Sequence, residues 1–126
     1  MKDIENREDI WLLVSNFYSK VMADPLIGHF FTATDFLLEE HLPVITSFWE
    51  TILFDVITYK GNPMLKHIRM NEIMPLKEVH FERWLQVWEE TINKNFAGEK
   101  ADEALKRGKM IAHLMDFKIN GKNLIH

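Results

Sequence analysis

The sequence contains no cysteine, and its five glycines and four prolines are scattered rather than clustered. The lack of cysteine excludes disulfide frameworks, cysteine-ligated zinc sites and thiol catalysis. The isolated glycines form no phosphate-binding loop, and no Gly-x-Ser-x-Gly motif is present. No two of the six histidines lie three to five residues apart, so the ligand spacing of zinc proteins is missing. Kinases, serine hydrolases and zinc enzymes therefore lack their usual sequence support.

Excess positive charge and long apolar runs are missing as well. The net charge is −4 at pH 7 with lysines and glutamates interspersed, whereas nucleic-acid binding needs a clustered positive field. The N-terminus is polar, and no apolar run approaches the ~20 residues that a bilayer crossing requires. We therefore expect a cytoplasmic protein whose partners are neither nucleic acid nor a membrane.

The chain is long enough to hold one core. Its 126 residues, 47% of them hydrophobic, predict a single soluble domain over residues 1–126 that buries roughly two-thirds of its unfolded surface. Residues from about 120 to 126 continue past the last periodic segment, and we expect them to form a flexible tail.

Apolar residues recur with the helical period over most of the sequence, and no alternation typical of strands competes with it. The segment 25–31 predicts a tight corner with at most one or two helical turns. We place the second long helix near Glu39 or Glu40 because Pro43 is best tolerated in a first turn. Gly98 is suited to the cap after the third helix. The fold class is thus all-α, with four long helices in two hairpins: 10–22, 39–55, 76–96 and 100–119.

Between the second and third of these helices lies an irregular stretch. It begins with residues typical of turns, Tyr59-Lys60-Gly61-Asn62-Pro63. The segment 64–70 that follows is too short for a self-standing helix, and Pro75 ends the stretch. About twenty residues of loop within a small domain is a pattern that signals function or disorder.

Four residues stand out as candidates for chemistry. Tyr18 falls on the buried stripe of the first helix, and by pattern alone its hydroxyl is expected to bond a backbone carbonyl. By pattern alone, His41 reads as a water-exposed histidine at a helix start, and Trp84 as a core aromatic. His67, in a short segment amid irregular chain, is the one most readily aimed into a cleft by its flanking loops.

Tyr18, His67 and Trp84 stand in short strings that, in this order and spacing, resemble the third group of the truncated haemoglobins from about Trp11 to Ile119. The strings are Phe17-Tyr18-x-Lys20-Val21, Asp24-Pro25-Leu26-Ile27-Gly28-His29-Phe30-Phe31, Phe48-Trp49, Tyr59-x-Gly61-Asn62-Pro63-Met64-x-x-His67 and Phe81-x-x-Trp84-Leu85. The resemblance implies a globin-like two-over-two helical sandwich around haem b, with a loop-rich proximal segment.

The resemblance also implies roles for individual residues. His67 matches the proximal ligand of the haem iron, for which a neutral imidazole is a suitable donor. Tyr18 and Trp84 match the distal tyrosine and tryptophan, whose O–H and N–H can donate to a diatomic ligand. His41 matches the histidine at the mouth of the distal pocket, and Ile45 stands where related groups carry a polar glutamine.

Further residues are implied as haem contacts. Phe31 matches a phenylalanine packed against the porphyrin, while Phe30, Phe48 and Trp49 are expected to line the pocket with Tyr59 and Met64. Candidates for the propionates are Tyr59, Lys60, Lys66 and Arg69, and the sequence does not choose among them.

The resulting hypothesis is a haem protein that binds dioxygen, nitric oxide or carbon monoxide at an iron held by His67. Two distal donors slow ligand release, which favours ligand capture over bulk oxygen transport. Nitric oxide dioxygenation or peroxidase-like activity is an open extension that would need an electron donor, an unidentified reductase. The alternative is a haem-free helical binding scaffold derived from a globin fold. A haem-based sensor is a third class, for which 126 residues leave no room for an output domain.

Overall fold

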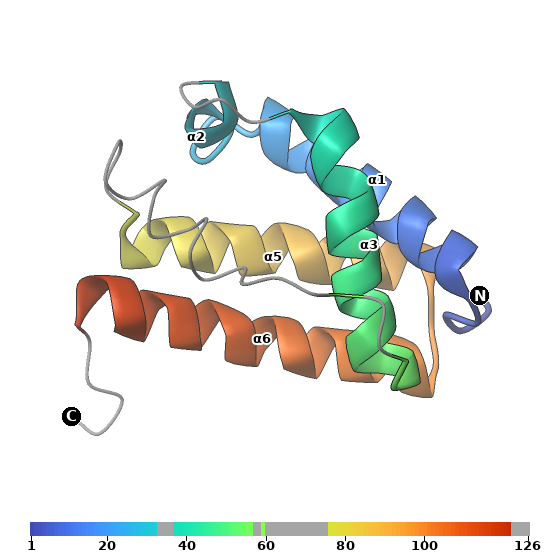
Figure 1. Ribbon diagram of the computed structural model, residues 1–126. Coiled ribbons are helices and arrows are strands. Elements are labelled where there is room, and N and C mark those ends of the chain that lie inside the picture. Colours follow the sequence, from blue (N-terminus) through green and yellow to red (C-terminus); the bar gives the residue numbers. More distant parts are fainter. Residues whose placement is uncertain (33–36, 57–58, 60–75, 122–126) are drawn as a thin grey trace.

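The computed structural model describes residues 1–32, 37–56, 59 and 76–121, and the regular structure within these ranges is entirely helical (Figure 1). Each long periodic segment of the sequence corresponds to a helix, which confirms the predicted all-α class. The helices are α1 (Arg7–Ala23), α2 (His29–Thr32), α3 (Leu38–Phe54), α5 (Glu78–Asn95) and α6 (Glu99–Asn120).

Local chemistry sets both ends of α1. At its start, the Asn6 side chain accepts a hydrogen bond of 2.9 Å from the backbone N–H of Asp9 and satisfies one of the orphan donors. At its end, Asp24 takes extended dihedrals because the following Pro25 disfavours the helical conformation. The helix therefore stops at Ala23, as predicted, and α2 follows within the expected tight corner.

Helix α3 begins at Leu38, slightly earlier than the predicted start, so Pro43 is its sixth residue rather than part of the first turn. Proline lacks the N–H that would bond the carbonyl of Glu39. Both Glu39 and Pro43 are exposed, so water can serve that carbonyl, which explains how the helix tolerates the proline there.

Gly98 has a different role from the predicted one. The C-cap residue of α5 is Phe96, in an extended conformation, and Gly98 is instead the N-cap residue that precedes α6, with φ of 142°. This left-handed value favours glycine. A Cβ on Gly98 would also lie 2.5 Å from the carboxyl carbon of Asp3, so the close approach of the N-terminal segment requires glycine as well.

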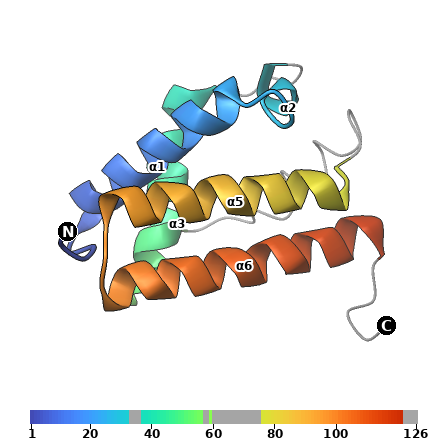
Figure 2. The ribbon, with the colours of Figure 1, turned by 180° about the vertical axis from the view of Figure 1, so that it is seen from behind.

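The helices pack as two crossed pairs. Helices α5 and α6 lie side by side, while α1 and α3 pack together across them (Figures 1 and 2). Gly108 lets α6 approach α5 closely, because a Cβ there would meet the indole of Trp88 at 2.5 Å. The same indole is 1% exposed and donates its N–H to the carbonyl of Ala104 over 3.0 Å. Trp88 is thus a central core residue whose polar atom is satisfied.

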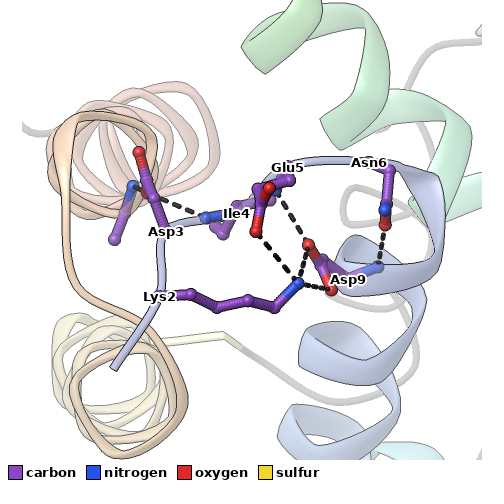
Figure 3. Close-up of polar contacts among 7 residues, drawn as sticks. Lys2, Asp3, Ile4, Glu5, Asn6 and Asp9 are labelled. Carbon is purple, nitrogen blue, oxygen red and sulfur yellow. Dashed lines mark hydrogen bonds and ion pairs between the residues drawn. The ribbon is translucent and has the colours of Figure 1, made fainter.

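The N-terminal segment is fastened to the connection between α5 and α6 (Figures 1 and 2). The Asp3 carboxylate accepts 2.8 Å hydrogen bonds from the backbone N–H groups of Lys100 and Ala101, and so caps α6 from 97 residues away. Lys2 and Asp9 form an ion pair of 2.8 Å next to it (Figure 3). We call Lys2, Asp3, Asp9 and the start of α6 the N-terminal clip.

Some predictions concern residues that the structure does not describe, or residues near them. The loop-rich proximal segment and the tail beyond Gly121 lie outside the described residues. Asn120, expected in that tail, is the last helical residue of α6, and its side chain donates to Asp116 over 2.6 Å. Within the described ranges, none of the helices is both long and apolar enough to pass through a bilayer.

Candidate functional site

Tyr18 and His41 meet where α1 crosses α3. The Tyr18 hydroxyl oxygen lies 2.8 Å from Nε2 of His41, and the two rings are nearly perpendicular with centroids 5.0 Å apart. Tyr18 is 7% exposed and His41 is half-buried. The pattern-based expectations were a backbone partner for Tyr18 and an exposed His41. The structure corrects both, because the start of α3 leans over the buried stripe of α1. We call these two residues the distal pair.

Burial raises the pKa of the Tyr18 hydroxyl well above its ordinary value, because the surrounding apolar rings disfavour a charged phenolate. The hydroxyl therefore keeps its proton at neutral pH and can act as a donor. In the bond to His41, either the phenol donates to an unprotonated Nε2 or a protonated Nε2 donates to the phenol oxygen. In the second arrangement the phenol hydrogen is available to another acceptor.

Aromatic rings surround the distal pair on two sides. Phe17 contacts Tyr18 edge-on at 5.1 Å between centroids and Trp84 at 5.4 Å. Phe31, at the end of α2, contacts Tyr18 at 6.0 Å. These T-shaped contacts are the favoured aromatic geometry, and they restrict the rotation of the Tyr18 ring.

Trp84 lies in the second turn of α5 and stacks on Trp88 with centroids 6.1 Å apart. It is half-buried, unlike the fully buried Trp88. Its neighbour Arg83 bonds the buried Asp24 carboxylate over 2.7 Å. Burial alone would raise the pKa of Asp24, but the Arg83 guanidinium and the backbone N–H groups of Leu26 and Ile27 outweigh it and lower the pKa. This ion pair ties the end of α1 to the turn of α5 that carries Trp84.

Several large apolar side chains of the described helices remain only partly covered. They come from α2, α3 and α5 and pack against the core on one side. A flat, apolar prosthetic group needs such a surface, with a few polar groups that fix its ligand. The chemistry of this set therefore fits haem. Its members are Phe31, Leu42, Ile45, Phe48, Ile52, Trp84 and Leu85.

Other predicted pocket residues occupy varied places. Phe30 is 2% exposed and packs against His80 with centroids 4.8 Å apart. Trp49 is 3% exposed and stacks on Trp88 at 4.6 Å, deep in the core. Tyr59 is half-buried beside Phe48, at 5.2 Å between ring centroids. Their contact with haem stays a prediction.

His67, the predicted iron ligand, lies outside the described residues, as do Met64 and the propionate candidates Lys60, Lys66 and Arg69. The described part of the site therefore consists of the distal pair, Trp84 and the partly covered apolar residues of α2, α3 and α5.

Comparisons with known proteins agree with this arrangement. The family described as Bacterial-like globin matches residues 3–117. A group 3 truncated haemoglobin of Campylobacter jejuni is 33% identical over 111 residues, covering 85% of each chain. The crystal structure of the group III truncated haemoglobin from Campylobacter jejuni superposes with a TM-score of 0.80 and 32% identity, over 94% of this chain and 95% of that one.

The chain belongs to the bacterial-like globin family. The expected resemblance to group III truncated haemoglobins and the globin-like two-over-two fold are thereby confirmed. Membership of this globin family implies haem binding, with small gaseous molecules as ligands.

Two features of this globin site were missed by the sequence reasoning. Asp24 was recognised only as the residue before Pro25, although it is also the buried partner of Arg83. Tyr18 and His41 were named separately, and their direct contact was not foreseen. An aspartate at a helix end with an arginine on a neighbouring amphipathic helix was the available signal for the first. No local signal existed for the second, since 23 residues separate the partners.

Proposed function

We propose that this globin binds haem b through His67 and holds a diatomic ligand, such as dioxygen, nitric oxide or carbon monoxide, beside Tyr18 and Trp84. The distal pair carries the proposal, because it places a protonated phenol and an imidazole together against the aromatic rings of Phe17 and Phe31. Such a polar contact in an apolar surrounding suits a small ligand that acquires partial negative charge.

When bound, haem supplies an iron centre at which a diatomic gas can coordinate. The protein supplies the surroundings. Tyr18 keeps its proton and donates a hydrogen bond to the ligand, while the rings of Phe17 and Phe31 hold the phenol in place. Trp84 offers an indole N–H as a second donor. Ile45 adds only apolar surface and helps to exclude water.

His41 would control how Tyr18 acts. While Tyr18 donates to His41, the phenol hydrogen is engaged, and it becomes available when Nε2 is the donor or when the imidazole leaves. Its half-buried position on α3 suits a residue at the pocket mouth. We propose that His41 governs access to the distal side and sets the orientation of the Tyr18 hydroxyl.

Redox chemistry is an extension of this proposal. Nitric oxide dioxygenation or peroxidase-like turnover would require electrons from a reductase. Strong hydrogen bonding by Tyr18 and Trp84 slows ligand release, which suits capture and conversion better than bulk oxygen transport.

An absorption spectrum after haem addition tests the proposal. We expect a sharp Soret band that shifts on reduction and on carbon monoxide addition. His67→Ala should weaken the band or change its character. His113→Ala, which removes an exposed histidine of α6, should leave it unchanged.

Failure to bind stoichiometric haem would overturn this proposal and favour a haem-free binding scaffold. An unchanged spectrum in His67→Ala would keep the haem protein but remove His67 from the iron.

A further inference from the structure

A small polar cleft opens between the C-terminal halves of α1 and α5, apart from the distal pair. Its volume is about 210 Å³. All five side chains that line it are polar or positively charged, and none is acidic. They are Asn16, Ser19, Lys20, Lys94 and Asn95.

The lining side chains have little to bind within the described structure. No ion pair within 4.0 Å joins either lysine to a described carboxylate, and the side chains of Asn16 and Ser19 have no hydrogen-bond partner among the described residues. Asn95 donates to the carbonyl of Thr91 over 2.7 Å and is the anchored member. By contrast, three other cationic side chains of the described residues each form an ion pair with a carboxylate at 2.9 Å or less. They are Lys2, Arg7 and Arg83.

The two lysines lie in the last turns of their helices, where a positive charge is favoured by the helix dipole. That effect explains their location on each helix separately. It does not explain why the two charges face one cleft in a chain of net charge −4. Two full positive charges outweigh the roughly half negative charge at each helix end, so the cleft attracts anions.

The donor set indicates the class of anion. Lysine binds phosphate as a point charge, and amide and hydroxyl groups add directed hydrogen bonds to its oxygens. The volume limits the size of the ligand, because drug-sized ligands occupy roughly 300–1,000 Å³. The cleft is too small for a nucleotide, whereas its volume is sufficient for a single phosphate group.

We propose that this cleft binds inorganic phosphate between Lys20 and Lys94. The bound ion bridges α1, which carries Tyr18, and α5, which carries Trp84. Since it binds the folded chain and links two helices, it also stabilises the fold. The assignment is independent of haem binding.

Isothermal titration of the full-length chain with inorganic phosphate, at constant ionic strength and pH, tests the proposal. We expect saturable one-to-one binding, with no comparable heat from chloride. Lys20→Gln and Lys94→Gln should each raise the dissociation constant about tenfold or more, as the loss of a charge-assisted bond predicts. Lys106→Gln, an exposed lysine of α6 outside the cleft, is the matched control and should bind phosphate like the parent chain.

A further cleft variant changes the charge while keeping the shape of the side chain. Asn16→Asp replaces an amide by an isosteric carboxylate and should abolish binding by like-charge repulsion. Circular dichroism of each variant establishes that it is folded. Equal loss of affinity in Lys106→Gln and the cleft variants, or parent-like affinity in Lys20→Gln and Lys94→Gln, would overturn the site. Adenosine monophosphate binding more tightly than phosphate would overturn the assignment of size.

Discussion

The N-terminal clip and the distal pair are two of the polar links between distant parts of this chain, and their chemistry differs. In the N-terminal clip, the Asp3 carboxylate receives hydrogen bonds from three backbone N–H groups, including those that begin α6. In the distal pair, two side chains meet across two helices through one hydroxyl and one imidazole nitrogen.

The difference follows from what the partners can do. Backbone N–H groups of a helix terminus are fixed in place, so the clip has one geometry and contributes to stability. The phenol and the imidazole can exchange donor and acceptor roles, and each can rotate. The clip is therefore suited to holding the fold, whereas the distal pair is suited to responding to a ligand.

Tyr18→Phe is the change with the largest expected effect on ligand binding. A hydrogen bond to a ligand with partial negative charge contributes about 1.5–3 kcal/mol, so the dioxygen dissociation rate should rise about tenfold or more. Stopped-flow measurement on the haem-loaded protein gives this rate. An unchanged rate would remove Tyr18 from its distal role, and Asp3→Ala should leave the rate as it is in the parent.

Asp3→Ala should lower the stability of the fold while leaving the dioxygen dissociation rate unchanged. It leaves the first N–H groups of α6 without their cap, and losing a cap costs about 0.5–2 kcal/mol of stability. Urea unfolding followed by circular dichroism measures this change. Asp102→Ala removes an exposed carboxylate from the same turn of α6 and should cost less. Equal effects of the two variants would contradict the capping role of Asp3.

Acid should weaken the clip. Burial alone would raise the pKa of Asp9, but its hydrogen bonds to Lys2 and to the backbone of Glu5 hold the pKa below its usual value. Backbone hydrogen bonds similarly lower the pKa of Asp3. A carboxyl with a lowered folded pKa contributes stability above its ordinary value of 3.8, and this is lost as the pH falls further.

Urea midpoints measured from pH 6 to pH 3 test this prediction. The parent chain should lose stability at the acid end, and Asp9→Asn should lose less over the same range because one titrating group is gone. A variant curve parallel to that of the parent would show that Asp9 does not contribute to the acid sensitivity.

Lys2→Met should have the smallest effect. The Lys2 side chain is 54% exposed, and ion pairs open to solvent contribute little and are screened by salt. We expect a slight fall in the urea midpoint at low salt that disappears at high salt. A loss as large as that of Asp3→Ala would mean that the ion pair, rather than the helix cap, holds the clip.

The sequence was most informative where the physics is local. The Asp24-Pro25 step predicted the end of α1 correctly, since the dihedral restriction before proline acts within one residue. The start of α3 was placed slightly too late, because tolerance of Pro43 depends on solvent access to the Glu39 carbonyl. Gly98 was assigned to the wrong helix end, since its role depends on Asp3, far away in sequence.

The candidate site was predictable in part for the same reason. Tyr18 and Trp84 were recognised as inward residues because the helical period shows which face each occupies. The exposure of His41 was mispredicted, because a residue at the edge of an apolar stripe is buried only if another helix covers it.

The sequence by itself determined the helical class and the main helix boundaries, because helix periodicity, caps and proline act over a few neighbours. Only the tertiary structure decided which residues meet: Tyr18 with His41, Asp24 with Arg83, and Asp3 with the start of α6. These contacts depend on how the helices cross, and packing of whole helix faces, rather than any local signal, sets that crossing.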